Sequence, residues 1–190
     1  MKLLALDTTT ENIVIGLHVE GHNEVFVGEK GSKKHNAALL GLIDDLLKNN
    51  GLDIKDIDVF GVSVGPGSFT GIRVGVATIN AFALANNKKT VEVVTLDLPV
   101  VEGENVLTMI DCKHDNYYCG LYIDGKVDYL PLTKVEIDAI KVDKILMNGT
   151  YGKELIFKCL QKAERGDFVT QAKPFYLKRS SAERETGILC

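Results

Sequence analysis

The stretch DTTTENIVIGLHVEG, residues 7–21, recurs in altered form as DCKHDNYYCGLYIDG, residues 111–125. The copies share aspartate, asparagine, glycine and leucine at matching places, each 104 residues apart, as are Asp7 and Asp111. Each copy ends at a glycine, Gly21 or Gly125, where a tight hairpin turn needs a positive φ. A constant register favours an internal duplication over a chance likeness between two hairpins. The pattern predicts three strands in each copy.

The duplication continues beyond the hairpins. An apolar strand and a helix follow each hairpin unit, but the second unit has only a short helical stub before its strand. The predicted segments are strands over Ile57–Val64 and Lys144–Met147, helices over Lys33–Asn50, Phe69–Ala85 and Lys153–Ala163, and a stub over Thr133–Ile140. The sequence therefore predicts two βββαβα lobes, residues 1–98 and an abbreviated 99–190.

Two such lobes suggest the α/β fold of the actin-like ATPases (the ASKHA or RNase H-like fold). In that fold the turn after the first strand faces a nucleotide phosphate, an analogy that does not establish function. On this analogy, a vestigial phosphate loop comprises Asp7, Thr8, Thr9 and Thr10. Asp7 has an equally good alternative as a turn-forming acid whose side chain bonds its own loop.

Composition narrows the functional class. The chain has 190 residues, is 45% hydrophobic and 25% charged, and carries a formal net charge of −4, which disfavours unaided nucleic-acid binding. Its four cysteines form no CxxC or zinc spacing. No apolar run reaches the length of a membrane span. We expect a cytoplasmic protein with reduced thiols and no membrane association.

The glycine-rich stretch GPGSFTGIRVG, residues 65–75, invites comparison with nucleotide motifs. It lacks the lysine of a Walker A loop, misses the third glycine of a Rossmann fingerprint, and places Pro66 and Thr70 where a nucleophile elbow fails. We therefore expect Gly65 and Gly67 to form a strand-to-helix turn, with Ser68 or Thr70 capping the helix.

Two predicted helices carry more apolar surface than one sheet contact requires. Residues 69–85 are apolar nearly all round with Arg73 as the only charge, and residues 37–47 show a wide leucine-rich arc. Glycines at 71 and 75 would allow another helix to approach closely. One interpretation is a two-sided internal core; the favoured one is a subunit interface, with a partner for Arg73 across it. The expected partner-binding residues are Leu39, Leu40, Ile43, Leu47, Gly71, Ile72, Arg73, Gly75, Val76, Ile79 and Phe82.

No metal or catalytic constellation is predicted. His18 and His22 lie on a strand and its turn rather than on one helix face, and His114 beside Cys112 has no further ligand. We expect no cofactor. An alternative remains an ATP-dependent phosphotransferase of the actin-like superfamily; a peptidase lacks any Ser-His-Asp order.

Five segments carry a resemblance to a known family. They read LLALDTTTENIVIGL, HNAALLGLIDDLL, FGVSVGPGSFTGIRVGVATINAFA, IDCKHDNYYCGLY and PFYLKR. Together they resemble the bacterial TsaB (YeaZ) family over residues 1–85 and 106–125 and at Pro174–Leu177.

The resemblance implies a non-catalytic subunit of the machinery that makes N6-threonylcarbamoyladenosine at position 37 of tRNA. In that machinery the related TsaD carries the metal and transfers the threonylcarbamoyl group, and the ATPase TsaE joins them. The resemblance implies docking of TsaD through a helical bundle built from residues 37–47 and 71–84. A homodimer in the absence of TsaD, and tRNA contact only through the complex, complete this expectation.

Overall fold

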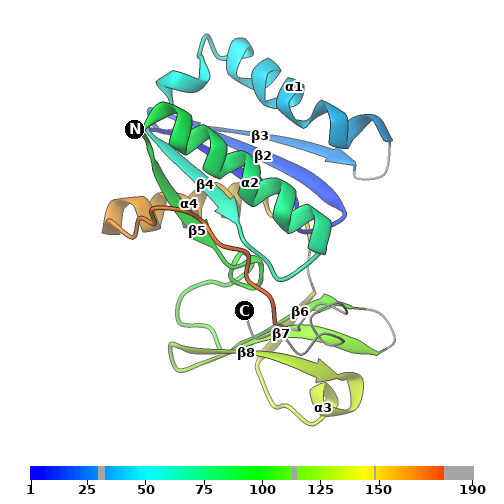
Figure 1. Cartoon of the computed structure of the whole chain (residues 1–190). Coiled ribbons are helices and arrows are strands. Elements are labelled where there is room, and N and C mark those ends of the chain that lie inside the picture. Colours follow the sequence, from blue (N-terminus) through cyan, green and yellow to red (C-terminus); the bar gives the residue numbers. More distant parts are fainter. Residues whose placement is uncertain (30–32, 113–114, 148, 178–190) are drawn as a thin grey trace.

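The computed structural model describes residues 1–29, 33–112, 115–147 and 149–177, whose strands form two sheets (Figure 1). The first sheet has the order β3-β2-β1-β4-β5, with β1 antiparallel to β2 and parallel to β4. Its strands are β1 Lys2–Asp7, β2 Asn12–Val19, β3 His22–Glu29, β4 Val59–Ser63 and β5 Lys89–Val93.

The second sheet repeats this order without a fifth strand. It runs β8-β7-β6-β9, again with one antiparallel and one parallel neighbour for its first strand, β6. Its strands are β6 Val106–Asp111, β7 Asn116–Ile123, β8 Lys126–Thr133 and β9 Lys144–Met147. The strand β5 of the first sheet lies outside the predicted repeat.

The predicted duplication is confirmed at the level of single residues. The strands β6, β7 and β8 begin and end 104 positions after β1, β2 and β3. Both hairpin turns have two consecutive residues with positive φ, Glu20 and Gly21 at 50° and 87° and Asp124 and Gly125 at 50° and 75°. This conformation matches the right-handed twist of the flanking strands.

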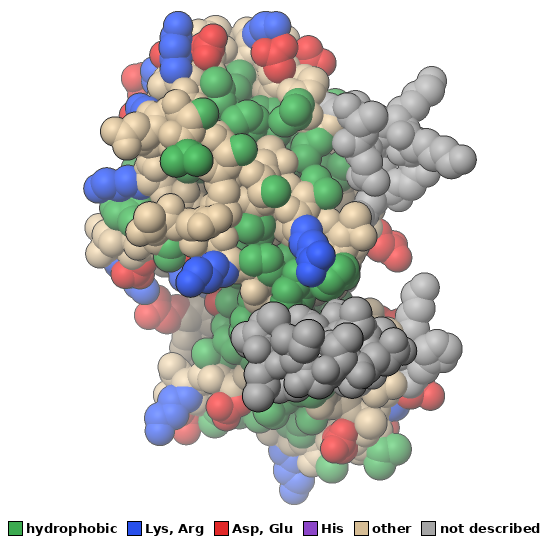
Figure 2. Space-filling model, in the orientation of Figure 1, with side chains coloured by type: hydrophobic (Ala, Val, Ile, Leu, Met, Phe, Trp, Pro, Cys, Tyr) green, Lys and Arg blue, Asp and Glu red, His purple; other side chains and the backbone are tan. Residues whose placement is uncertain are grey.

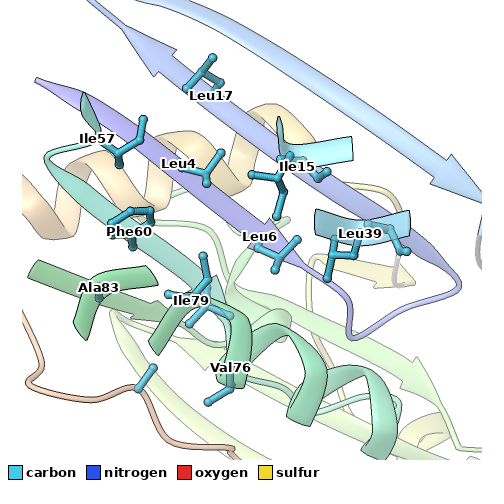
Figure 3. Packing of buried hydrophobic residues seen from close by; sticks show 14 of the residues in the cluster. Leu4, Leu6, Ile15, Leu17, Leu39, Ile57, Phe60, Val76, Ile79 and Ala83 are labelled. Carbon is cyan, nitrogen blue, oxygen red and sulfur yellow. The ribbon is translucent and has the colours of Figure 1, made fainter. Parts of the chain in front are cut away.

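Alternating side chains of the first sheet build two apolar layers. Leu4 and Leu6 of β1 point into one layer, which α1 (Lys33–Asn49) and α2 (Phe69–Asn86) cover (Figure 3). Leu3 and Ala5 point the other way, toward α4 (Gly152–Arg165). The first lobe is therefore a sheet between two helical layers.

The position of α4 does not follow the order of the chain. This helix comes after β9, as α2 comes after β4, yet it packs on β1, β2 and β5 of the first sheet. Its Leu155, Ile156 and Cys159 are fully buried there. The division at residue 98/99 stays a prediction, and it does not describe this packing.

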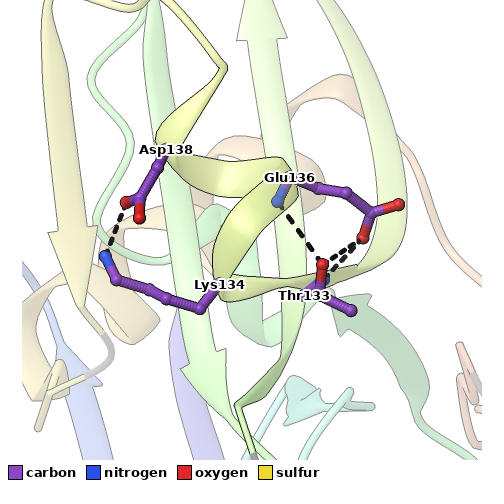
Figure 4. Close-up of polar contacts among 4 residues, drawn as sticks. All are labelled: Thr133, Lys134, Glu136 and Asp138. Atoms are coloured by element: carbon purple, nitrogen blue, oxygen red, sulfur yellow. Dashed lines mark hydrogen bonds and ion pairs between the residues drawn. The ribbon is translucent and has the colours of Figure 1, made fainter.

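The second lobe has one short helix, α3 (Lys134–Asp138), in place of a long one. A capping box holds it, since Thr133 Oγ1 accepts from the Glu136 amide while the Glu136 carboxylate accepts from the Thr133 amide at 2.7 Å (Figure 4). Lys134 and Asp138 add an exposed ion pair at 2.8 Å. The predicted stub over Thr133–Ile140 is thus confirmed.

The Asp97 carboxylate connects the two lobes through hydrogen bonds. Asp97, in the short 3-10 turn Thr95–Asp97 after β5, accepts hydrogen bonds of 2.5 Å from the hydroxyls of Tyr122 and Tyr129. Burial and the Asp97 charge raise the pKa of both tyrosine hydroxyls. Phe175 packs edge-on against Tyr129. The contact fixes the second sheet against the end of the first lobe.

Candidate partner-binding helix and interlobe cleft

The glycine-rich loop before α2 packs directly on the turn between β1 and β2. Gly65 has φ +109°, and a side chain at Gly67 would collide with the backbone carbonyl of Thr9. The Ser68 amide donates to that carbonyl at 2.7 Å, and the Ser68 hydroxyl caps α2 by accepting from the Gly71 amide. The predicted roles of Gly65, Gly67 and Ser68 in a strand-to-helix turn are therefore confirmed.

Polar groups in the turn that contains Asp7 form hydrogen bonds within the turn and with neighbouring residues. The Asp7 carboxylate accepts from the amide and the hydroxyl of Thr9, at 2.8 and 2.7 Å. Thr9 Oγ1 also lies 3.1 Å from Thr95 Oγ1, which lies 2.8 Å from Ser63 Oγ. Asp7 and Thr9 are 2% and 1% exposed. The turn-forming alternative for Asp7 thus describes its observed contacts with Thr9.

The remaining two residues of the predicted phosphate loop differ. Thr8 is buried and donates to the carbonyl of Gly71 at 2.6 Å, so it anchors the start of α2. Thr10 is half-buried at the edge of the interlobe cleft. Whether any of these groups meets a phosphate stays a prediction.

A cleft of about 920 Å³ lies between the lobes. The turn between β1 and β2 lines one side of it and the end of β6 lines the other. Asn12 of the first lobe donates to Thr150 Oγ1 at 2.7 Å. The described part of its lining contains carboxylates, hydroxyls and apolar groups but no lysine or arginine. The lining residues are Thr9, Thr10, Glu11, Asn12, Gly67, Ser68, Ile110, Asp111, Cys112, Tyr118, Met147, Gly149 and Thr150.

Most of the residues expected to bind a partner instead face the chain's own sheet. In α2 the side chains of Ile72, Val76 and Ile79 are 1%, 5% and 0% exposed, and in α1 Leu39, Ile43 and Leu47 are equally enclosed. These side chains pack within the chain's own core. Partner binding by these helices and by the residues named for it stays a prediction.

Gly71 and Gly75 also serve the interior. Both are buried, and a Cβ at Gly75 would collide with the Thr8 hydroxyl. Gly75 therefore admits the β1–β2 turn rather than a helix from outside. Phe82 is half-buried, with its ring 5.9 Å from the ring of Phe60.

The exposed side of α2 consists mostly of alanine and larger apolar side chains. Its side chains recur every three or four positions: Phe69, Arg73, Ala77, Ala81, Leu84 and Ala85. We call these six residues the α2 outer face. Leu84 is 85% exposed and Phe69 43%, and Leu40 of α1 is 60% exposed on the same side of the sheet. Figure 2 shows hydrophobic side chains at the surface over these helices.

Arg73, expected to find its partner across a subunit boundary, has contacts within the chain. Its guanidinium lies 3.9 Å from the ring centroid of Phe69, one turn earlier in α2. Its Nε donates to the Tyr176 hydroxyl at 3.1 Å. Phe69 and Tyr176 themselves pack with ring centroids 5.4 Å apart. These contacts supply no counter-charge, and the expected partner of Arg73 across a subunit boundary stays a prediction.

Tyr176 reaches this place through a segment that hydrophobic periodicity does not identify. Residues 166–177 return from α4 along β5 and α2 (Figure 1). Val169 donates to Thr90 O at 2.9 Å, and Phe175 donates to Val64 O at 2.8 Å. The Asn80 side chain bonds both polar backbone groups of Ala172. The segment covers the open edge of β5, which would otherwise present unpaired backbone groups.

Other sequence features have structural roles. His18 is hydrogen-bonded to the side chain of Asn23 at 2.6 Å, across the hairpin turn. Among the residues that the structure describes, no three histidine, cysteine or acidic side chains gather as a metal site. None of the described helices is long and apolar enough to cross a membrane. His114 lies outside the described residues.

Comparison with known proteins agrees with this fold. The chain superimposes on YeaZ from Pseudomonas aeruginosa with a TM-score of 0.78 and 24% identity, over 93% of this chain and 99% of that one. A second structure from Pseudomonas aeruginosa, described as an uncharacterized protein with similarity to peptidase YeaZ, gives a TM-score of 0.79. The predicted actin-like α/β fold is confirmed.

Sequence comparison identifies the family. The family model of TsaD, the tRNA N6-adenosine threonylcarbamoyltransferase, matches residues 25–176. The TsaB protein of Haemophilus influenzae is 30% identical over 133 residues, 67% of this chain and 56% of that protein. TsaB of Escherichia coli is 30% identical over 129 residues, 64% of this chain and 55% of that protein. The chain spans just over half the length of these relatives. It belongs to the TsaB (YeaZ) family of tRNA threonylcarbamoyladenosine biosynthesis proteins.

Proposed function

We propose that the chain is a non-catalytic scaffold subunit of the complex that forms N6-threonylcarbamoyladenosine at position 37 of tRNA. It binds TsaD through the α2 outer face together with Leu40 of α1. The single observation that carries the proposal is that face: an exposed apolar helix surface, with Leu84 85% exposed, in a family of t6A biosynthesis proteins. Such a surface gains free energy when a partner covers it.

The small residues of the face suit a helical partner. Ala77, Ala81 and Ala85 follow one another at four-residue steps and are exposed. Their short side chains let a second helix pack close to the backbone of α2, so that larger side chains of the partner fill the spaces between them. Leu84 and Leu40 then extend the apolar contact on either side.

A non-catalytic role agrees with the contacts of Asp7. A catalytic carboxylate must meet a substrate or a water, whereas Asp7 is 2% exposed and accepts two hydrogen bonds from Thr9. In the proposal TsaD performs the transfer, TsaE joins the complex, and tRNA is held by the complex rather than by this chain alone. A cytoplasmic location and a homodimer in the absence of TsaD belong to the same proposal.

The test is binding to TsaD from the same organism, measured by calorimetry, with t6A formation on tRNA in the reconstituted system as the second readout. Ala81→Glu should abolish both while changing the free energy of unfolding by less than about 0.5 kcal/mol, since the position is exposed. Phe157→Glu is the matched control, because Phe157 is a 56% exposed residue of α4 on the opposite side of the sheet.

Three results would contradict the proposal. Equal losses from Ala81→Glu and Phe157→Glu would show that the α2 outer face has no special role. Tight ATP binding with turnover by the chain alone would favour the phosphotransferase. Retention of tRNA by the isolated chain would overturn the view that tRNA contact needs the complex.

A further inference from the structure

We propose that Arg73 is a specificity determinant of the α2 outer face: it receives a carboxylate from a helix of the partner protein. This inference rests on the proposed function. It adds the chemistry of the partner. The partner helix carries an acidic residue where it packs against the N-terminal part of α2.

The guanidinium of Arg73 is held ready for such a contact. The Phe69 ring supports its plane at 3.9 Å, and the Tyr176 hydroxyl takes the Nε hydrogen bond at 3.1 Å. Among the residues that the structure describes, no hydrogen bond or ion pair involves its two terminal amino groups. These two groups form the fork that binds a carboxylate bidentately, and their planarity reduces the entropy lost on binding.

The surroundings of Arg73 make an uncharged partner unfavourable. Arg73 is the only charged side chain of the α2 outer face, and it stands in the second turn of the helix, near the end where the macrodipole is positive. A partner that covers Ala77 and Ala81 also removes water from Arg73. A charge that loses its water without gaining a counter-charge opposes binding. A tightly binding partner must therefore supply the carboxylate.

The charge pattern favours a different protein over a second copy of this chain. The sequence of α2, FTGIRVGVATINAFALAN, contains no acidic residue, so two α2 helices packed together supply no carboxylate to Arg73. A parallel pair would bring the two Arg73 side chains together. In α1, Asp44 and Asp45 are exposed acids on this side of the sheet. A second copy that docks α1 on α2 is thus the competing outcome.

Calorimetry with TsaD, at low and high salt, tests the proposal. Arg73→Ala should weaken binding about 10- to 100-fold and reduce its salt dependence. Arg73→Lys should fall between, since it keeps the charge and loses the planar fork. Lys153→Ala is the matched control, because Lys153 is an exposed cation in the first turn of α4 on the other side of the sheet. It should bind as the unaltered protein does.

The outcomes separate this inference from the proposed function. If Ala81→Glu abolishes binding while Arg73→Ala leaves affinity and salt dependence unchanged, docking stands and the carboxylate contact is overturned. If the unaltered chain fails to bind TsaD, both fail. If Arg73→Ala weakens self-association of the isolated chain in sedimentation but leaves its affinity for TsaD unchanged, a second copy supplies the acid and the proposal is overturned. Restored binding between Arg73→Glu and a TsaD variant with one helical acid changed to lysine would support it.

Discussion

Thr8 and Gly75 are in contact beneath the first turns of α2, where the Thr8 hydroxyl donates to the carbonyl of Gly71 at 2.6 Å. A methyl group at position 75 would overlap that hydroxyl. Replacement of a helical glycine by alanine ordinarily stabilises a helix by about 1 kcal/mol. We expect Gly75→Ala to lower the free energy of unfolding instead, by about 1–3 kcal/mol, because the turn or the helix must move. Urea unfolding measures it.

The control for this prediction lies in α1. Gly41 is exposed, and a Cβ there meets nothing within 4 Å. Gly41→Ala should therefore stabilise the protein by up to about 1 kcal/mol. In a Thr8→Ala background, Gly75→Ala should cost less, since the colliding hydroxyl is absent. A stabilising Gly75→Ala in the unaltered background would refute the steric explanation.

The positions of the hairpin turns could be predicted from the sequence, because turns with positive φ favour glycine, and Gly21 and Gly125 mark them. The orientation of α2 could not. When a helix is apolar on all sides, the 3.6-residue period that separates a buried from an exposed face is lost. The sequence therefore predicts excess apolar surface on α2 but does not indicate which residues face the sheet. The structure shows that Ile79 faces the sheet and that Ala81 faces outward.

The position of α4 and the surroundings of Arg73 lay beyond prediction for another reason. Strand order within a lobe follows from short connections, whereas the sheet that a helix covers depends on the shape of the whole core. The sequence of α4 predicts an apolar face, but it does not indicate that this face packs on the sheet of the first lobe. Similarly, Tyr176 lies 103 positions from Arg73 and joins it through an irregular segment with no periodic signal.

The three-residue contact of Asp97 with Tyr122 and Tyr129 gives a second stability prediction. Each tyrosine hydroxyl donates to the same carboxylate oxygen, so Tyr122→Phe and Tyr129→Phe each remove one charge-assisted hydrogen bond. Such bonds contribute about 1.5–3 kcal/mol, and each variant should lose about that much from its unfolding free energy. Asp97→Ala should cost at least as much, since both hydroxyls lose their acceptor.

Tyr117→Phe is the control for these variants, because Tyr117 belongs to the same strand as Tyr122 but packs against the core of the second lobe. If the contact fixes the lobes, small-angle scattering should detect a wider distribution of overall dimensions for Asp97→Ala than for Tyr117→Phe. Indistinguishable scattering and unfolding curves for the two variants would remove the fastening role of Asp97.

The leucine at position 84 provides a prediction about solubility. Leu84 is 85% exposed on the α2 outer face, so little of its side chain packs within the chain. Leu84→Lys should leave the free energy of unfolding within about 0.5 kcal/mol of its original value and should reduce self-association of the isolated chain. Sedimentation at several concentrations measures the second effect, with Val135→Lys as the control, since Val135 is 79% exposed on α3 in the other lobe.

Buried protonated groups predict a loss of stability at alkaline pH. Burial raises the pKa of the Cys159 thiol from 9.0 to about 12 and that of Cys119 to about 11, and it also raises the pKa values of Tyr122 and Tyr129. Above pH 9 the unfolded chain releases thiol protons that the native protein retains, so the unfolded state binds fewer protons. The free energy of unfolding must then fall as pH rises, by up to about 1.4 kcal/mol per pH unit for each such group. The contribution of Cys159 is complete below pH 9 and is lost progressively between pH 9 and about 12.

Urea unfolding across this interval should show a shallower fall for Cys159→Ala, because alanine has no proton to release. The exposed thiol of a variant such as Gly41→Cys should leave the slope unchanged, since a cysteine there is solvated in both states. Parallel pH curves for the unaltered protein and Cys159→Ala would show that the buried thiol does not control alkaline stability.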